Sequence, residues 1–138
     1  MKYAPSTEPV PQSSRRAVNE KLLYLIDSGA CDTYGITTED VFQGYTGDGG
    51  LHGLSRKDYE NYHRYSEAKK ELENGQFFTP PDLCQFVVDC LQLERDDLVA
   101  DLTCGMGNFF NVMPVEANVY GCELDTKAYK VASFLYPE

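Results

Sequence analysis

The C-terminal half of the chain constrains the fold most, because strand-like and helix-like patterns alternate there around a glycine turn. Residues 98–102 form a short apolar run that is typical of a buried strand. The turn Cys104-Gly105-Met106-Gly107 follows and predicts a short helix over residues 108–113. Residues 118–122 read as a second strand and residues 125–135 as a further helix. This order predicts an α/β fold that opens with the βαβ unit of a doubly wound, Rossmann-like sheet.

A helix is also predicted ahead of the first strand. Thr79 can cap it, Pro80 suits its first position and Asp82 favours its positively polarised end. Apolar residues then recur at helical spacing, which predicts a face turned toward a core: Leu83, Phe86, Val87, Cys90 and Leu91.

The first 74 residues read as a mostly helical region. Residues 1–13, with three prolines, predict a flexible or extended arm. A helix is expected from Ser14 to Gly29, with an apolar face that includes Leu22 and Leu25. A helical turn is expected after Thr37. The glycine-rich segment 44–53 favours a mobile loop over a phosphate-binding loop, because no Lys-Ser/Thr pair follows it.

A longer helix is expected over residues 55–73, where Ser55 and Asp58 resemble a capping box. Tyr59, Tyr62 and Tyr65 give it an aromatic face. Core packing explains such a face better than base stacking, although both interpretations stay open. The chain therefore divides into an arm over 1–13, a helical region over 14–74 and an α/β region over 75–138.

Charge and cysteine content argue against three features: binding of a nucleic-acid backbone by the C-terminal half, a metal site and a disulfide framework. The net charge is −10, and residues 76–138 hold ten acidic but only three basic side chains. Such a stretch is poorly suited to binding a phosphate backbone by itself. Five scattered cysteines and two histidines predict neither a metal site nor a disulfide framework. The sequence contains neither a membrane-spanning apolar run nor a signal peptide, so we expect a cytoplasmic protein with reduced thiols.

The turn after the first predicted strand is the candidate ligand site. Glycines let the backbone approach a ligand, and Glu123 stands 18 residues after Gly105, near the ~20 expected for an acidic residue that holds ribose hydroxyls. The dinucleotide fingerprint is only half met, because Phe110 stands where its third glycine would be. Cys104 has no accompanying base pattern and is interpreted as a small turn residue rather than a nucleophile.

Three segments together resemble the S-adenosylmethionine-dependent N6-adenine DNA methyltransferases, in the order of the gamma-type and type I modification subunits. Residues 75–80, Gly-Gln-Phe-Phe-Thr-Pro, resemble motif X of that family. Residues 101–109 resemble motif I, with Leu102 in place of the usual proline and Met106 in place of a small residue. Residues 121–125 resemble motif II. The resemblance covers residues 75–138.

The resemblance implies S-adenosyl-L-methionine as cofactor and assigns roles to nine residues. Phe78 and Thr79 would lie against its amino-acid end, and Asp101 near its ammonium group. The backbone around the turn would wrap the methionine and sugar, Glu123 would hold the ribose hydroxyls and Leu124 would pack on adenine. The full set is Phe78, Thr79, Asp101, Thr103, Cys104, Gly105, Gly107, Glu123 and Leu124.

The resemblance further implies methyl transfer to adenine N6 in DNA, in a restriction-modification or mobile-element setting. The family's catalytic Asn/Asp/Ser-Pro-Pro-Tyr/Phe motif does not occur in the sequence, since the only Pro-Pro, at Pro80-Pro81, has different flanks. We therefore expect an N-terminal portion whose catalytic and DNA-contacting parts lie beyond Glu138. Two alternatives stay open: a non-catalytic module that completes its sheet with a partner subunit or a second copy, and an acidic mimic of DNA.

Overall fold

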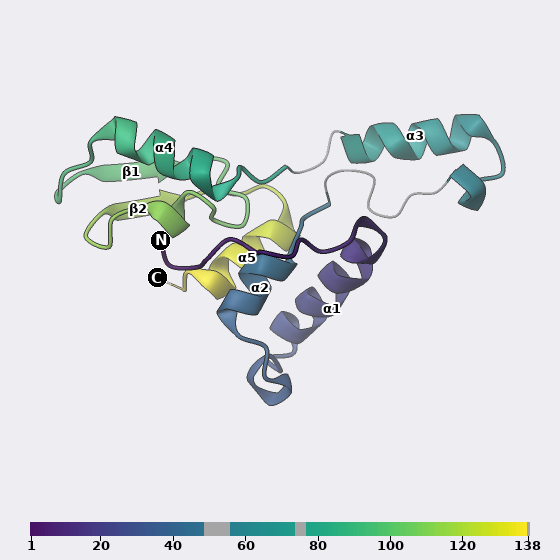
Figure 1. The fold of residues 1–138 in the computed structure, drawn as a ribbon, viewed down its shortest axis with the longest axis horizontal. Helices are drawn as coiled ribbons and strands as arrows, with labels where there is room; N and C mark the ends of the chain where they lie inside the picture. The colour runs from purple at the N-terminus through teal and green to yellow at the C-terminus, as the bar shows by residue number, and fades with distance from the viewer. Residues whose placement is uncertain (49–55, 74–76, 138) are drawn as a thin grey trace.

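The computed structural model describes residues 1–48, 56–73 and 77–137, and its elements follow the predicted order (Figure 1). The helices are α1 (Arg15–Asp27), α2 (Thr38–Gly44), α3 (Tyr62–Glu73), α4 (Pro81–Leu91) and α5 (Thr126–Leu135). The strands are β1 (Leu98–Asp101) and β2 (Asn118–Gly121). Four short 3-10 turns complete the described elements: η1 (Gln12–Ser14), η2 (Asp32–Tyr34), η3 (Arg56–Asp58) and η4 (Phe110–Val112).

The two strands pair in parallel, which supports the predicted α/β architecture. Leu98 lies opposite Asn118 and Asp101 opposite Gly121. The pairing continues past the strand ends, where Cys122 N donates to Asp101 O at 2.8 Å and Cys104 N donates to Cys122 O at 2.9 Å. The connection between the strands carries the short turn η4 instead of the longer helix expected over residues 108–113.

The strands and α4 are more exposed than their apolar sequences predict. The expected stripe on α4 faces solvent, with Phe86 64% exposed, whereas Cys84 and Val88 on the other face pack against Val112. β1 alternates exposed and half-buried residues instead of being buried throughout. The reason is that the described sheet has two strands, so little surface is available to cover these apolar side chains.

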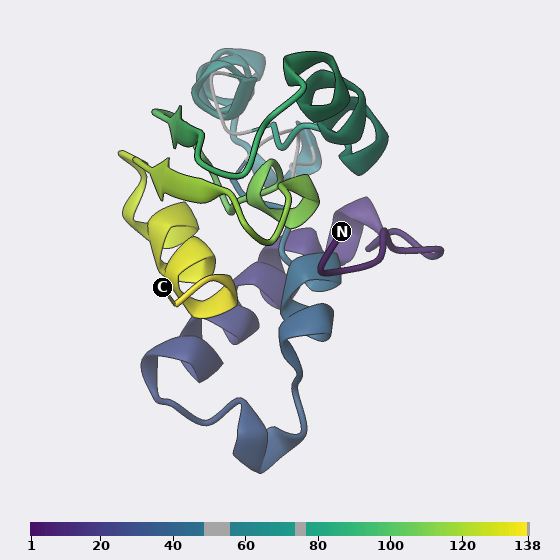
Figure 2. The ribbon, with the colours of Figure 1, turned by 90° about the vertical axis from the view of Figure 1, so that its left-hand side faces the viewer.

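Helices α1, α2 and α5 share one hydrophobic core (Figures 1 and 2). The predicted faces are confirmed: Leu22 and Leu25 of α1 are buried, and so are Ala128, Val131, Ala132 and Leu135 of α5. The core combines side chains from both halves of the chain: Tyr3, Leu22, Val41, Phe42, Tyr45, Met106, Val131 and Leu135. The helical region and the α/β region therefore share this core, and the predicted boundary between them does not separate two cores.

The N-terminal arm is anchored at its start rather than flexible there. Tyr3 is only 4% exposed, and its hydroxyl donates to Leu135 O at 2.9 Å. The buried Asn111 side chain accepts from Tyr3 N at 2.6 Å and donates to Tyr3 O at 2.9 Å. An aromatic ring and a paired backbone fill this corner of the core, and Lys2 and Tyr3 both donate to Leu135 O at the end of α5.

Local caps explain where several helices begin. Thr37 and Asp40 form a reciprocal capping box at α2, which confirms the expected helical turn. Asp125 caps α5 by accepting from two backbone amides. Helix α4 begins one residue later than expected, because Pro80 precedes another proline and is thereby held in an extended conformation.

Helix α3 begins at Tyr62, later than predicted, where Asn61 Oδ1 accepts from Arg64 N at 3.0 Å. Tyr59 and Tyr65 are in edge contact with centroids 5.7 Å apart, while Tyr62 is largely exposed. The described tyrosines of this face belong to neither core cluster, so the prediction of core packing is wrong here. Ser55, the helix end at 74–75 and most of the glycine-rich segment lie outside the described residues. Within the described ranges, no helix combines the length and apolar character needed to cross a membrane.

Candidate functional site

A cavity of about 350 Å³ lies where β1 and β2 end, which is the edge of a parallel sheet at which α/β proteins bind ligands. Seven of the nine residues predicted from the sequence line it: Phe78, Thr79, Asp101, Thr103, Cys104, Gly105 and Glu123. The segment before α4, the glycine turn and the end of β2 therefore meet around one space.

The backbone at Gly105 allows this close arrangement. Its φ of +57° lies in the left-handed region, and a Cβ there would stand 3.0 Å from two carbons of the Phe78 ring. The Phe78 ring thus packs directly on the turn. This contact brings the segment before α4 onto the glycine turn, although Phe78 and Gly105 are more than twenty residues apart in the sequence.

The Glu123 carboxylate fixes the turn from the opposite strand. Its Oε2 accepts from Gly105 N at 2.8 Å, and its Oε1 accepts from Asp125 N at 2.8 Å. Asp101 Oδ1 accepts from Thr103 N at 3.1 Å and so shapes the start of the same turn. Two carboxylates therefore stand at the edge of the cavity in defined orientations.

Cys104 is a buried part of the turn. Burial, with smaller contributions from the Asp101 and Glu123 carboxylates, raises the pKa of its thiol to about 11. A thiol with such a pKa stays protonated near neutral pH, which makes it a poor nucleophile. The geometry thus supports the interpretation of Cys104 as a small residue that fills a tight turn.

Two predicted residues lie outside the cavity lining. Leu124 is 97% exposed. Gly107 lies behind the turn, where a Cβ would stand 2.5 Å from Cε2 of Tyr136. Met106, whose bulk could have obstructed the cavity, points into the shared core and is 2% exposed.

Three lining residues were missed by the sequence analysis: Phe77, Asn108 and Phe109. Asn108 Nδ2 donates to Thr79 O at 2.9 Å and so ties the segment before α4 to the turn. Its Oδ1 is buried without a hydrogen-bond partner among the described residues. All three residues lie within the segments that resemble motifs X and I, and that position was the available signal.

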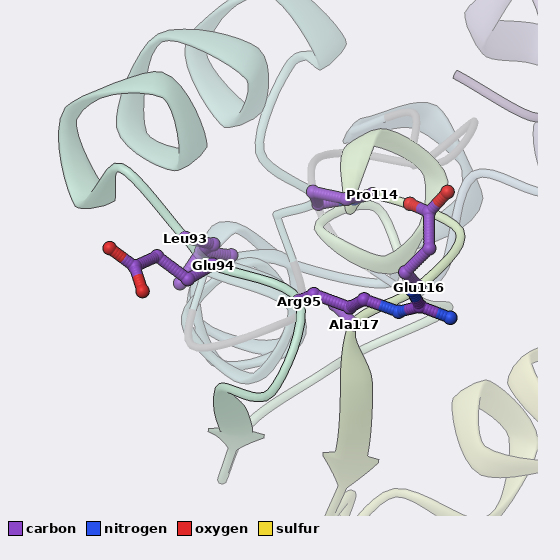
Figure 3. A pocket seen from close by; sticks show the side chains of 6 residues that line it. All are labelled: Leu93, Glu94, Arg95, Pro114, Glu116 and Ala117. Atoms are coloured by element: carbon purple, nitrogen blue, oxygen red, sulfur yellow. The ribbon is translucent and has the colours of Figure 1, made fainter.

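A different hollow of about 310 Å³ lies at the opposite end of the sheet, where both strands begin (Figure 3). Its lining includes Arg95 and Glu116, whose side chains extend to the same side, while Glu94 points away from them. Parallel sheets seldom bind ligands at this end, so the cavity at the strand ends is the better candidate.

Across the described ranges, no group of three or more His, Cys, Asp or Glu side chains is arranged to hold a metal ion. The five cysteines form no disulfide, and Cys31, Cys84 and Cys104 are buried. The groups that line the cavity include carboxylates, hydroxyls, a side-chain amide, a thiol and aromatic rings.

Comparison with known proteins identifies a family for the chain. No solved structure matches the chain. The family model described as N-6 DNA methylase matches residues 57–134, which is more than half of the chain and includes the whole cavity lining. The chain therefore belongs to the N-6 DNA methylase family.

Proposed function

We propose that the cavity binds S-adenosyl-L-methionine and that the chain is the cofactor-binding portion of a DNA methyltransferase that modifies adenine at N6. One observation carries this proposal: the Gly105 backbone, the Asp101 and Glu123 carboxylates and the Phe78 ring surround one cavity at the strand ends. Family membership supports DNA adenine methylation as the reaction.

The residues present suit the chemistry of this cofactor. A carboxylate such as Asp101 is a good partner for an ammonium group, and the Phe78 ring offers apolar surface for the carbon chain of the amino-acid end. Phe77 and Phe109 offer apolar surface for an aromatic base. The cavity volume is within the range of about 300–1,000 Å³ that small-molecule sites occupy. The acidic lining also suits a ligand with a positively charged sulfonium.

Glu123 can serve the turn and a ligand at once. Each carboxylate oxygen has two lone pairs, and each accepts one backbone hydrogen bond here. Among the described residues, one acceptor position on each oxygen therefore stays free for two adjacent hydroxyls. The backbone amides of Gly105 and Asp125 hold the carboxylate in orientation, which lowers the entropy cost of binding.

The bound cofactor would supply an electrophilic methyl group on its sulfonium. The residues of this chain would orient the amino-acid end, sugar and base of that cofactor. We assign no catalytic residue to the chain, because the Asn/Asp/Ser-Pro-Pro-Tyr/Phe motif does not occur in its sequence. DNA contact is proposed for parts other than the acidic α/β segment.

Calorimetric titration with S-adenosylmethionine and S-adenosylhomocysteine tests this proposal. Glu123→Ala should weaken both affinities at least about tenfold, since hydrogen bonds to charged groups contribute about 1.5–3 kcal/mol. Glu116→Ala is the matched control, because this exposed carboxylate lies at the opposite end of the sheet. An unchanged affinity in folded Glu123→Ala would refute the ribose assignment, and absence of binding by the wild type would refute the cofactor proposal.

A second candidate function is supported by the exposed apolar residues of α4 and β1, which include Phe86, Leu91 and Leu98. Such a surface favours association, with a partner subunit or a second copy that completes the sheet. Sedimentation velocity of the chain distinguishes the cases, because a well-folded monomer at micromolar concentration would count against self-association.

A further inference from the structure

Tyr45 connects the N-terminal helices to the candidate cavity. It directly follows α2, is 3% exposed and belongs to the core shared by α1, α2 and α5. Its ring lies 5.9 Å from that of Phe78, measured between centroids. The residue precedes the segment matched by the family model, so nothing in the motifs points to it.

The contact continues from Phe78 to the glycine turn. The Phe78 ring stands 3.0 Å from the position that a Cβ on Gly105 would take, and Gly105 N in turn donates to Glu123. Tyr45, Phe78 and Gly105 therefore form an unbroken line of contacts from the N-terminal helices to the cavity. A change in the bulk of Tyr45 would reach the cavity through Phe78.

The hydroxyl of Tyr45 is buried and has no hydrogen-bond partner in the described part of the chain. Burial is the largest cause that raises the pKa of this hydroxyl, followed by the carboxylates of Asp48, Asp125 and Glu123. The hydroxyl thus stays protonated and is available as a donor. Buried polar groups are nearly always paired, so an unpaired donor on a residue that packs against the lining residue Phe78 needs an explanation.

We propose that Tyr45 is a positioning residue of the cofactor cavity, whose ring supports Phe78 and whose hydroxyl becomes hydrogen-bonded when the cavity is filled. This inference rests on the proposed function, because it requires a ligand in that cavity. The acceptor is the Asp125 carboxylate, because both of its capping amides bind Oδ1. The Glu123 oxygens are used by two backbone amides and, in this proposal, by the ribose hydroxyls. Tyr45 acts through Phe78 and Asp125 and touches no reacting group.

The substitution Tyr45→Phe isolates the hydroxyl. No hydrogen bond is lost in the free chain, so the urea midpoint should be unchanged or higher. Affinity for S-adenosylhomocysteine should nevertheless fall about fivefold, which is the scale of one hydrogen bond. A purely structural role would not produce a binding loss without a loss of stability.

Tyr136→Phe is the matched control. Its hydroxyl is also buried without a partner in the described residues, but its ring packs behind the turn on Gly107. This variant should have the same effect on stability and leave the affinity for S-adenosylhomocysteine unchanged. An equal loss of affinity in both variants would overturn the inference, because the effect would then not be specific to Tyr45.

Tyr45→Leu tests whether the Tyr45 ring holds Phe78 in place. Phe42→Leu is the control, since Phe42 lies in the same core but stacks on Tyr3. Because Phe78 is assigned to the amino-acid end of the cofactor, Tyr45→Leu should weaken S-adenosylhomocysteine more than methylthioadenosine, which lacks that end. The inference would be overturned if Tyr45→Leu lost equal affinity for the two ligands, or if Tyr45→Phe bound S-adenosylhomocysteine as tightly as the wild type. Either result would leave the proposed function intact. Failure of the wild type to bind either ligand would refute the proposed function together with the inference.

Discussion

Substituting Gly107 by alanine tests how the glycine turn is supported from behind. Gly107 has a φ of +89°, which L-residues seldom adopt. A Cβ at this position would stand 2.5 Å and 2.8 Å from two ring carbons of Tyr136, and 3.1 Å from Cδ2 of Phe110. The rings are held on both sides, because Phe110 and Tyr136 are themselves in edge contact at 5.6 Å.

The expected cost has two parts. Left-handed backbone costs an L-residue about 1–2 kcal/mol. Forcing a methyl group into a packed region adds about 1–3 kcal/mol. Gly107→Ala should therefore lower the free energy of unfolding by about 2–5 kcal/mol, a large fraction of the ~5–15 kcal/mol that stabilises a typical domain.

Gly29→Ala separates the two parts. Gly29 has a similar φ of +63° at the end of α1, but a Cβ there would meet nothing within 4 Å. This control should lose only the backbone part, about 1–2 kcal/mol.

Urea unfolding followed by far-UV circular dichroism measures both variants, with equal m-values as the condition for comparison. The double variant Gly107→Ala/Tyr136→Ala should lose less than the sum of the two single losses, because the second change removes the obstructing ring. If Gly107→Ala costs no more than Gly29→Ala, or if the double variant is additive, the packing argument is refuted.

Three further predictions concern the core, a helix cap and a buried thiol. Asn111→Leu should cost about 2–4 kcal/mol in urea unfolding, because the buried N–H and C=O of Tyr3 both lose their partner; a cost below that of an exposed substitution would contradict it. Thr37→Ala removes the acceptor of Asp40 N and should cost about 0.5–2 kcal/mol, with loss of helical signal as a second readout; an unchanged urea midpoint would refute the capping role. Burial raises the pKa of Cys104 from 9.0 to about 11, so the folded state holds its proton longer than the unfolded state does, and stability present below pH 9 should decline toward pH 11. Between pH 9 and pH 11 the urea midpoint should fall less steeply with pH in Cys104→Ala than in the wild type. Equal slopes would show that this thiol does not contribute to the pH dependence of stability.

Elements with a strong local pattern were predicted well. The α5 face of Ala128, Val131, Ala132 and Leu135 is buried as its spacing implies, and Asp125 caps the helix where the sequence places its start. The strands and their parallel pairing also agree with the pattern. These features depend on nearest neighbours and on side-chain periodicity, which a sequence displays directly.

Features that depend on a distant partner were predicted poorly. The stripe on α4 that includes Phe86 has the periodicity of a core-facing helix, but the two-stranded sheet does not cover it. The tyrosines around Tyr62 contact one another, and Tyr3 fills a corner of the core despite its place in a proline-rich arm. Periodicity shows that a side chain can be buried, but not which surface is available to bury it.

The sequence by itself determined the order of the elements and most of the cavity lining, because motif residues such as Gly105 and Glu123 act through local backbone geometry. Only the tertiary structure decided that Glu123 already accepts two backbone hydrogen bonds, that Gly107 supports the turn from behind, and that Tyr45 reaches the site from the N-terminal helices. Apart from the bond between Glu123 and Asp125, these contacts join residues far apart along the chain. They arise from the packing of complementary surfaces, which no single segment encodes.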